Sequence, residues 1–297
     1  MTRSETAVNT PGGPWTPAVA TTGLTALAML AFAANSLLCR AALAGGHADA
    51  PSFTTLRLAG GALTLGLVAR WQRSARPSSR FAWGSAVALF GYAIGFSLAY
   101  VRISAGAGAL LLFGAVQLTM VAAGLRAGER PRALEWAGHA LSIAGLVFLT
   151  WPGLARPDPL GALLMLGAGA AWGVYSLRGR ARTDAVASNA ASFARSFLLA
   201  VGASVTFAFL GATHIDRVGV GLALGSGALA SGLGYAVWYA ALRSLAATRA
   251  ALVQLSVPPL AAAGGVMLLG ESLSPKLLVA GLLILGGMAL AVAGHRR

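Results

Sequence analysis

Charged residues and thiols are scarce in this sequence. Charged residues make up 10% of the 297 residues, whereas soluble domains carry roughly 25%, and only 8 residues are acidic. The single cysteine, Cys39, excludes a disulfide framework and a cysteine-based metal site. The sequence also lacks a Walker-type phosphate loop, a GxSxG nucleophile motif and an HExxH zinc motif. These absences argue against an enzyme, and we expect neither a cofactor nor a metal.

Apolar residues dominate instead, with 57% of the chain hydrophobic and a mean hydropathy of +0.74. They fall into ten blocks of about 20 residues, a length that at 1.5 Å per residue crosses a hydrocarbon core of roughly 30 Å. Residues 1–18 precede them as a polar tail, rich in Pro and Gly, that we expect to be disordered. The candidate spans are 19–40, 52–70, 82–101, 104–126, 133–151, 160–178, 186–210, 218–241, 249–270 and 276–294.

The net charge of +14 would suggest nucleic acid as a partner in a soluble protein. Here the basic residues lie in short links between spans, and they alternate in number from one link to the next. The side that holds both termini carries 15 of the 22 basic residues and the other side carries 5. The positive-inside rule therefore places both termini in the cytoplasm, and we expect no nucleic-acid partner.

The sequence contains an internal repeat. Ala109–Glu129, ALLLFGAVQLTMVAAGLRAGE, returns as Ala251–Glu271, ALVQLSVPPLAAAGGVMLLGE, 142 positions later. Arg57 and Arg195 lie in the second span of each copy and are 138 positions apart. Each copy has five spans, an odd number, so the second copy must enter the membrane from the opposite face.

We therefore predict an all-α membrane protein of two inverted five-helix repeats, residues 19–151 and 152–297. Inverted repeats are common in secondary transporters, whose substrate site lies near the bilayer midplane between the repeats. A non-transporting scaffold or sensor is the alternative class, and it would need long polar loops or appended domains, which this chain lacks. A membrane-embedded enzyme is a third interpretation.

These features resemble the ten-helix EamA branch of the drug/metabolite transporter superfamily. The resemblance rests on the two halves, on Gly128-Glu129 and Gly270-Glu271 at the ends of the fourth spans, on the Arg57 and Arg195 pair, and on Ala170-Ala171-Trp172. Within that branch, LLLFGAVQLTM followed by Gly-Glu-Arg-Pro is similar to the YddG-like amino-acid exporters. The resemblance implies a multi-pass transporter of the bacterial inner membrane.

The sequence departs from that family at one place. Family members often carry proline in the middle of the fourth span of each half, and here only the second half does, at Pro258-Pro259. Span 104–126 has Gly114 and Gln117 at that place instead. We therefore expect the two halves to be least alike in their fourth spans.

Several aromatic and polar side chains are predicted near the centre of the membrane. For the rings there are two interpretations, that they line a substrate cavity or that they pack the core. The polar groups should face the bundle interior, because hydrocarbon offers them no hydrogen-bond partner. There they either bind substrate or form hydrogen bonds between helices. Tyr100, Trp238 and Tyr239, nearer span ends, are expected in the interfacial belt. A ring-lined site without a fixed charge suits neutral amino acids with large apolar side chains. The candidate site residues are Asn35, Tyr92, Phe96, Phe113, Gln117, Trp172, Tyr235, Gln254 and Ser256, the last two beside the helix break expected at Pro258 and Pro259.

Arg57 and Arg195 are the only charges well inside predicted spans. One hypothesis is that each pairs with a carboxylate or with helix-end carbonyls to close one face, Arg57 with Glu271 and Arg195 with Glu129. The competing hypothesis is that each arginine packs its stem and extends its head to the nearby interface. In either case we expect these four residues and the two prolines to be structural or gating elements.

We expect the protein to export amino acids, aromatic or large neutral ones, or similar small metabolites by alternating access. No acidic residue is predicted at mid-membrane and the histidines are scattered, so facilitated diffusion or exchange is expected in place of a proton relay. A carrier of other organic solutes is the alternative. The expected partners are the small-molecule substrate and the lipid bilayer, and oligomeric state is left open.

Overall fold

The computed structural model describes residues 17–73, 82–153, 156–180, 184–211, 213–242, 244–245 and 253–295. The tail predicted at 1–18 lies outside these residues except for its last two, which begin the first helix. The elements are α1 (Pro17–Ala44), α2 (Ala50–Trp71), α3 (Ala82–Tyr100), α4 (Ala105–Arg126), α5 (Ala133–Thr150), α6 (Pro159–Arg180), α7 (Ala185–Phe209), α8 (Arg217–Leu224), the π-helix η2 (Gly225–Leu233), α9 (Gly234–Leu242), α11 (Val257–Leu269) and α12 (Pro275–His295).

The predicted all-helical membrane architecture is confirmed. Within the described ranges, nine helices are long and apolar enough to cross a membrane, with α8, η2 and α9 joined into one of them. The tenth, α11, has 13 residues and is shorter than the predicted span 249–270. It begins beside Pro258 and Pro259, because proline is tolerated only in the first turn, where no backbone N–H is needed. The prolines start this helix and do not break it in the middle.

The fourth spans of the two halves differ as expected. α4, which has no proline, runs without interruption for 22 residues. The second copy is helical at residues 253–254, turns at 255–256 and begins its main helix at Val257. The inverted repeat is therefore asymmetric at the position where proline occurs in only one copy.

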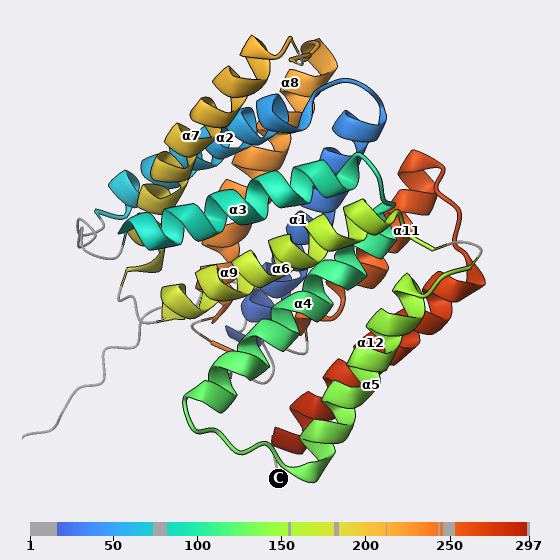
Figure 1. Cartoon of the computed structure of the whole chain (residues 1–297). Coiled ribbons are helices and arrows are strands. Elements are labelled where there is room, and N and C mark those ends of the chain that lie inside the picture. The colour runs from blue at the N-terminus through green and yellow to red at the C-terminus, as the bar shows by residue number, and fades with distance from the viewer. Residues whose placement is uncertain are drawn as a thin grey trace, which may run out of the picture.

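Contacts between the two halves occur in matched pairs, as an inverted duplication requires. α1 packs against η2 and α9, and its counterpart α6 packs against α3. α1 also packs against α11, as α6 packs against α4. Three helices contact their own counterparts: α2 contacts α7, α4 contacts α11 and α5 contacts α12. Figure 1 shows α2 beside α7 on one flank of the molecule and α5 beside α12 on another.

The α5–α12 contact is close because small residues face each other. A Cβ on Gly145 would lie 2.9 Å from the Ile284 nitrogen, and a Cβ on Gly287 would lie 2.6 Å from the Ser142 nitrogen. The Ser142 hydroxyl donates to the Ile284 carbonyl at 3.0 Å. Small residues allow two helix backbones to approach to this distance in a membrane.

The acidic residues mark helix ends. Asp49, Asp158, Asp184 and Asp216 each accept a hydrogen bond of 2.8 to 2.9 Å from a backbone N–H in the first turn of α2, α6, α7 and α8. Such caps satisfy N–H groups that have no partner within the helix. The repeated Gly-Glu is a helix stop, because Gly128 and Gly270 adopt positive φ angles of 88° and 66° that glycine reaches without strain.

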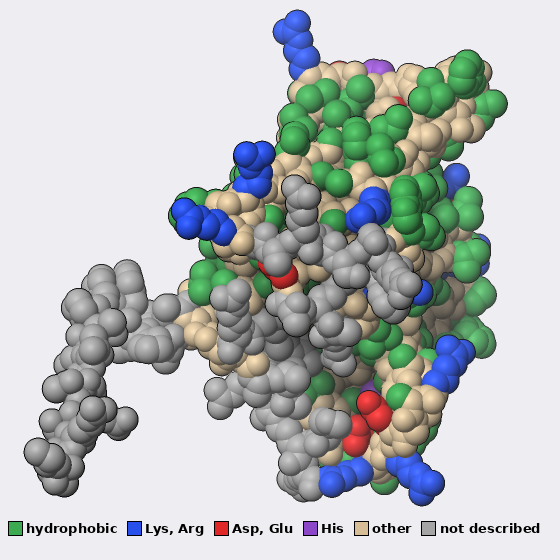
Figure 2. Space-filling model, turned by 90° about the vertical axis from the view of Figure 1, so that its left-hand side faces the viewer, with side chains coloured by type: hydrophobic (Ala, Val, Ile, Leu, Met, Phe, Trp, Pro, Cys, Tyr) green, Lys and Arg blue, Asp and Glu red, His purple; other side chains and the backbone are tan. Residues whose placement is uncertain are grey.

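The outer surface is strongly apolar. Leu63, Leu67 and Leu282 expose 68%, 68% and 76% of their area. Figure 2 shows hydrophobic side chains over much of the described part of one face. A soluble protein rarely exposes so large an apolar surface, whereas a membrane-spanning bundle presents it to lipid.

Candidate functional site

A cavity of about 500 Å³ lies between the two halves. Its walls come from α1, α3, α4, α6, the start of α7, η2, α9, α12 and the residues just before α11. Its volume is within the range of small-molecule sites, roughly 300–1,000 Å³. Eight of the nine candidate substrate residues line it: Asn35, Tyr92, Phe96, Phe113, Gln117, Trp172, Tyr235 and Gln254. That they bind substrate remains a prediction.

Aromatic rings form the centre of this cavity. Trp172 lies 4.8 Å from Tyr92, 5.5 Å from Tyr175 and 5.4 Å from Tyr235, measured between ring centroids. Tyr92 in turn lies 5.3 Å from Phe96. These tilted contacts suit ring quadrupoles and hold each ring in place. The repeat counterparts Phe96 and Tyr235 thus both reach the cavity, one from each half.

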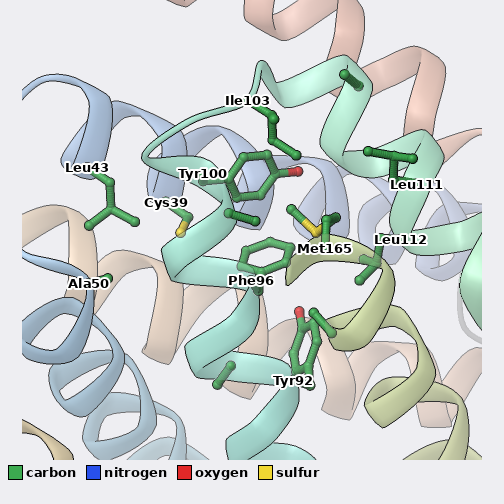
Figure 3. Packing of buried hydrophobic residues seen from close by; sticks show 14 of the residues in the cluster. Cys39, Leu43, Ala50, Tyr92, Phe96, Tyr100, Ile103, Leu111, Leu112 and Met165 are labelled. Carbon is green, nitrogen blue, oxygen red and sulfur yellow. The ribbon is translucent and has the colours of Figure 1, made fainter. Parts of the chain in front are cut away.

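The series of aromatic rings that begins in the cavity continues along α3 beyond it. Figure 3 shows Tyr92, Phe96 and Tyr100 following one another on this helix, with Met165 of α6 and Leu112 of α4 beside them. Phe96 and Tyr100 meet edge to face at 4.6 Å. Both are at most 1% exposed. Phe96 bounds the cavity and packs the core, whereas Tyr100, expected in the interfacial belt, lies in the core.

Sequence reasoning missed several lining residues. Trp238 and Tyr239, expected in the interfacial belt, line the cavity, and Trp238 is only 8% exposed. Phe32 joins them, with its ring 5.7 Å from Tyr235 and 6.0 Å from Trp238. Helical spacing could have found two of these residues. Trp238 follows Tyr235 by three positions and Phe32 precedes Asn35 by three, so each pair shares a helix face.

Ser256 is a correction to the predicted site. Its side chain is exposed, its hydroxyl donates to the Val253 carbonyl at 2.7 Å, and it is not among the residues that line the cavity. Ser256 lies in the turn at 255–256 that precedes α11, and its neighbours Gln254 and Leu255 line the cavity.

Arg57 neither pairs with Glu271 nor extends its head group to the membrane interface. Its side chain is 1% exposed, so it does not extend to an interface. Its Nη2 donates to the Tyr92 hydroxyl at 2.9 Å, and its Cζ lies 5.1 Å and 4.9 Å from the ring centroids of Tyr92 and Phe96. Glu271 is not its partner. A fixed positive charge therefore lies directly behind two rings of the cavity, which we had expected to be uncharged.

Glu271 is bound by Arg40 instead. The Arg40 Nε lies 2.9 Å from a Glu271 carboxylate oxygen, and the Arg40 Nη1 donates to the Tyr100 carbonyl at 2.8 Å. Glu271 also accepts from the Ala105 N–H, at the positive end of α4, at 2.9 Å. One carboxylate thus ties α11 to α1 and to the start of α4, while Arg40 reaches the end of α3.

The corresponding pair in the other half is not formed. Glu129 is exposed. The Arg195 Nη1 donates to the Ala191 carbonyl of its own helix at 3.2 Å. Among the residues that the structure describes, none of the three salt bridges joins Arg195 to Glu129.

The three salt bridges of the described residues all lie at one end of the molecule, which we call the closed end. They are Arg40–Glu271, His47–Asp216 and Arg102–Asp158, where α1 and α3 end and α6 and α8 begin. Hydrogen bonds from the Gly219 N–H and from His47 hold the pKa of Asp216 below its usual value. Two hydrogen bonds join the residues before α2 to those before α8: the Asp49 N–H donates to the His214 carbonyl, and the His214 N–H donates to an Asp49 carboxylate oxygen, both at 2.7 Å.

The cavity extends from the middle of the bundle towards the opposite end. On α4, which begins at the closed end, it takes in Leu112 to Met120. On α6, which runs the same way, it reaches Gly179, and it includes Ala185 at the start of α7. The described structure is therefore closed at one end and hollow towards the other.

Comparison with known proteins agrees with this architecture. The model of the EamA-like transporter family matches residues 21–151 and 159–293. An uncharacterized protein of Pseudomonas aeruginosa is 54% identical over 270 residues, covering 91% of this chain and 93% of its own length. A solved protein crystal structure shares the fold, with a TM-score of 0.64 at 20% identity over 93% of this chain and 99% of its own. The chain belongs to the EamA-like transporter family and is a multi-pass membrane transporter of small solutes.

Proposed function

We propose that the protein exports amino acids with aromatic or other large apolar side chains, or similar small metabolites, by alternating access. The observation that carries this proposal is the ring-lined cavity between the two halves, sealed at one end by Arg40–Glu271 and hollow towards the other. A carrier that works by rocking its halves needs such a site between them. We propose residues 19–151 and 152–297 as these halves.

The lining favours a cargo with an apolar body. Trp172, Tyr92 and Tyr235 offer ring faces and edges on which an aromatic or large aliphatic side chain can pack. The amides of Gln117 and Gln254 supply donors and acceptors in the same cavity. A few polar groups among many apolar ones are typical of small-molecule sites.

The charge distribution supports export. The cavity reaches towards the end where α4 stops at Arg126, and Arg130 and Arg132 follow in the next link. By the positive-inside rule this end faces the cytoplasm of an inner membrane, as do both chain termini. A site that opens there is accessible to cytoplasmic solutes.

The lining also supports facilitated diffusion or exchange. In the described part of the chain, the residues lining the cavity include no Asp, Glu or His. His139 is buried on α5 but is not among them. A proton-coupled carrier needs a group that gains and loses a proton along its pathway.

Flux measurements on purified protein in liposomes test this function. We expect efflux of aromatic and large neutral amino acids, and little inhibition by sugars or nucleosides. Trp172→Ala removes the central ring and should raise the KM for tryptophan about tenfold, since aromatic side chains provide much of the contact energy in such sites. Trp136→Ala, on α5 and 48% exposed, is the matched control and should leave the KM unchanged.

Two results would contradict the proposal. Absence of flux for every amino acid in the panel would contradict the proposal that amino acids are the substrates. Accumulation of substrate against its gradient, driven by a pH difference alone, would rule out facilitated diffusion and exchange as the transport mechanism.

A further inference from the structure

The cavity has a buried cation behind its wall that the proposed function does not use. Arg57 is 1% exposed, and its Nε and Nη1 have no hydrogen-bond partner in the described protein. None of the salt bridges between described residues includes it. A buried charge without a counter-charge is costly, and buried donors are nearly always satisfied. This arrangement therefore indicates a ligand that supplies the missing negative charge.

Tyr92 connects this cation to the cavity. Its hydroxyl accepts from the Arg57 Nη2 at 2.9 Å and from the Asn35 Nδ2 at 3.4 Å. A hydroxyl has two acceptor positions and one proton to donate. With both acceptor positions occupied, the Tyr92 proton is left to donate, and Tyr92 lines the cavity. Two donors, one of them charged, make that O–H a stronger donor.

The π-helix contacts both residues that bond the Tyr92 hydroxyl. The Ser226 hydroxyl of η2 donates to the Asn35 Oδ1 at 2.7 Å, and the Asn35 Nδ2 is the amide atom that meets Tyr92. Gly227 of η2 lies against the Arg57 backbone, because a Cβ there would lie 2.1 Å from the Arg57 carbonyl oxygen. π-helical segments inside longer helices occur frequently at functional sites.

The same π-helix supplies another free hydroxyl. Ser231 is 1% exposed and lines the cavity, and its Oγ has no partner among the described residues. Two hydroxyls among the lining residues, those of Tyr92 and Ser231, are thus available to a ligand, and the Arg57 guanidinium lies behind Tyr92. No carboxylate is among the lining residues of the described chain.

We propose that this wall is a carboxylate-binding subsite, in which the Tyr92 O–H donates to a cargo carboxylate and Arg57 supplies the counter-charge. The proposal rests on the proposed function and narrows it to solutes that combine an apolar body with a carboxylate. In a site of low dielectric constant, one fixed positive charge strongly favours an anionic group over a neutral or cationic one. Arg57 acts through Tyr92 and is a positioning residue.

Four compounds that share a phenyl ring test the subsite. Phenylalanine and phenylacetate carry a carboxylate, whereas phenylalanine methyl ester and phenethylamine do not. Dissociation constants are measured by calorimetry on purified protein, and flux is measured in liposomes. We expect the two carboxylates to bind at least about tenfold more tightly than the other two, as a charge-assisted hydrogen bond requires.

Variants separate binding from folding. Arg57→Met should weaken phenylalanine binding about tenfold or more, leave the methyl ester unchanged, and not lower the melting temperature, because it removes an uncompensated buried charge. Tyr92→Phe keeps the ring and should act in the same direction. Arg195→Met is the matched control, since the Arg195 guanidinium donates to a carbonyl of its own helix and does not line the cavity among the described residues, and phenylalanine binding should be unchanged.

Different results overturn different claims. Equal affinity for phenylalanine and its methyl ester would overturn the subsite while leaving the transport function standing. A loss of both ligands together in Arg57→Met, with a lower melting temperature, would show a structural arginine and also overturn the subsite. No flux of any of the four compounds would overturn the proposed function and the subsite with it.

Discussion

At the residue scale, this chain places its few acidic side chains at the ends of helices. Four aspartates cap first turns, and Glu271 joins Arg40 to the start of α4. In a membrane this is the least costly place for a carboxylate, because helix starts offer N–H donors and a positive dipole end. In the interior of the bundle, Arg57 is a buried positive charge that forms no salt bridge with any described acidic side chain.

The environment of Asp216 predicts how the melting temperature depends on pH. Its pKa is lowered in the folded protein, by the Gly219 N–H first and by His47 second. A carboxylate of this kind stabilises the fold above its unfolded pKa of about 3.9, and the contribution is lost as the pH falls through the folded pKa. Asp216→Ala should therefore lower the melting temperature at pH 7, and the difference from the natural protein should shrink below about pH 4.

Asp216→Asn is the control for this experiment. Asparagine caps helices about as well as aspartate but does not titrate, so its effect on the melting temperature should be small at pH 7. A difference between the natural protein and Asp216→Ala that stays constant from pH 7 to pH 3 would contradict the assignment.

The residues of the cavity were largely predictable, and their partners were not. Depth along a span can be counted from the sequence, so Tyr92, Trp172 and Gln254 could be placed near the middle. The rotation of each helix about its axis depends on packing against others, so Trp238 was assigned to the wrong environment. The partner of Glu271 could not be predicted for the same reason, because Arg40 lies at the end of its predicted span and the sequence alone does not indicate which carboxylate it contacts.

At the element scale, irregular helices surround the cavity. The span from Arg217 to Ala241 contains the π-helix η2, and α11 begins only at Val257. The prolines indicated an irregularity in span 249–270, although they start a helix and do not break one. The π-helix has no such signal, because Gly225–Leu233 reads GSGALASGL and small residues are equally compatible with ordinary helix packing.

Two adjacent glycines on α12 allow a test of the close packing between α5 and α12. A Cβ on Gly287 would lie 2.5 Å from the Gly138 carbonyl oxygen, whereas a Cβ on Gly286 meets nothing within 4 Å. Gly287→Ala should lower the free energy of unfolding by about 1–3 kcal/mol, because backbone atoms cannot move aside cheaply. Gly286→Ala should be neutral or stabilising by up to about 1 kcal/mol.

Denaturant or thermal unfolding in detergent, followed by circular dichroism, measures both changes. Equal effects of the two substitutions would show that α5 and α12 do not approach as closely as the structure has them.

At the scale of the whole molecule, inverted symmetry relates the closed end to the opposite end. Arg40 and Arg178 are 138 positions apart, as are Arg57 and Arg195, and Glu129 precedes Glu271 by 142. Arg178 is therefore the counterpart of the arginine that binds Glu271. In the described state Arg178 and Glu129 are both exposed, and no salt bridge of the described residues joins them.

We expect Arg178 and Glu129 to pair when the opposite end closes. Glu129→Arg or Arg178→Glu alone should lower flux in liposomes several-fold, because like charges then meet, and the double exchange should restore it. Combining Glu129→Arg with Arg195→Glu is the control and should not restore flux. Failure of the Arg178 exchange to rescue Glu129→Arg would show that the two ends close by different contacts.

The α5–α12 contact also bears on how such a chain can arise. Ser142 and Gly145 of α5 lie 142 positions before Ile284 and Gly287 of α12. Gly145 meets Ile284 and Gly287 meets Ser142, so each contact is the image of the other. That is the pattern of an isologous dimer interface, in which one surface is complementary to itself. A single five-helix ancestor able to insert in both orientations would already possess this interface, and gene fusion would only have to join two copies that bound each other.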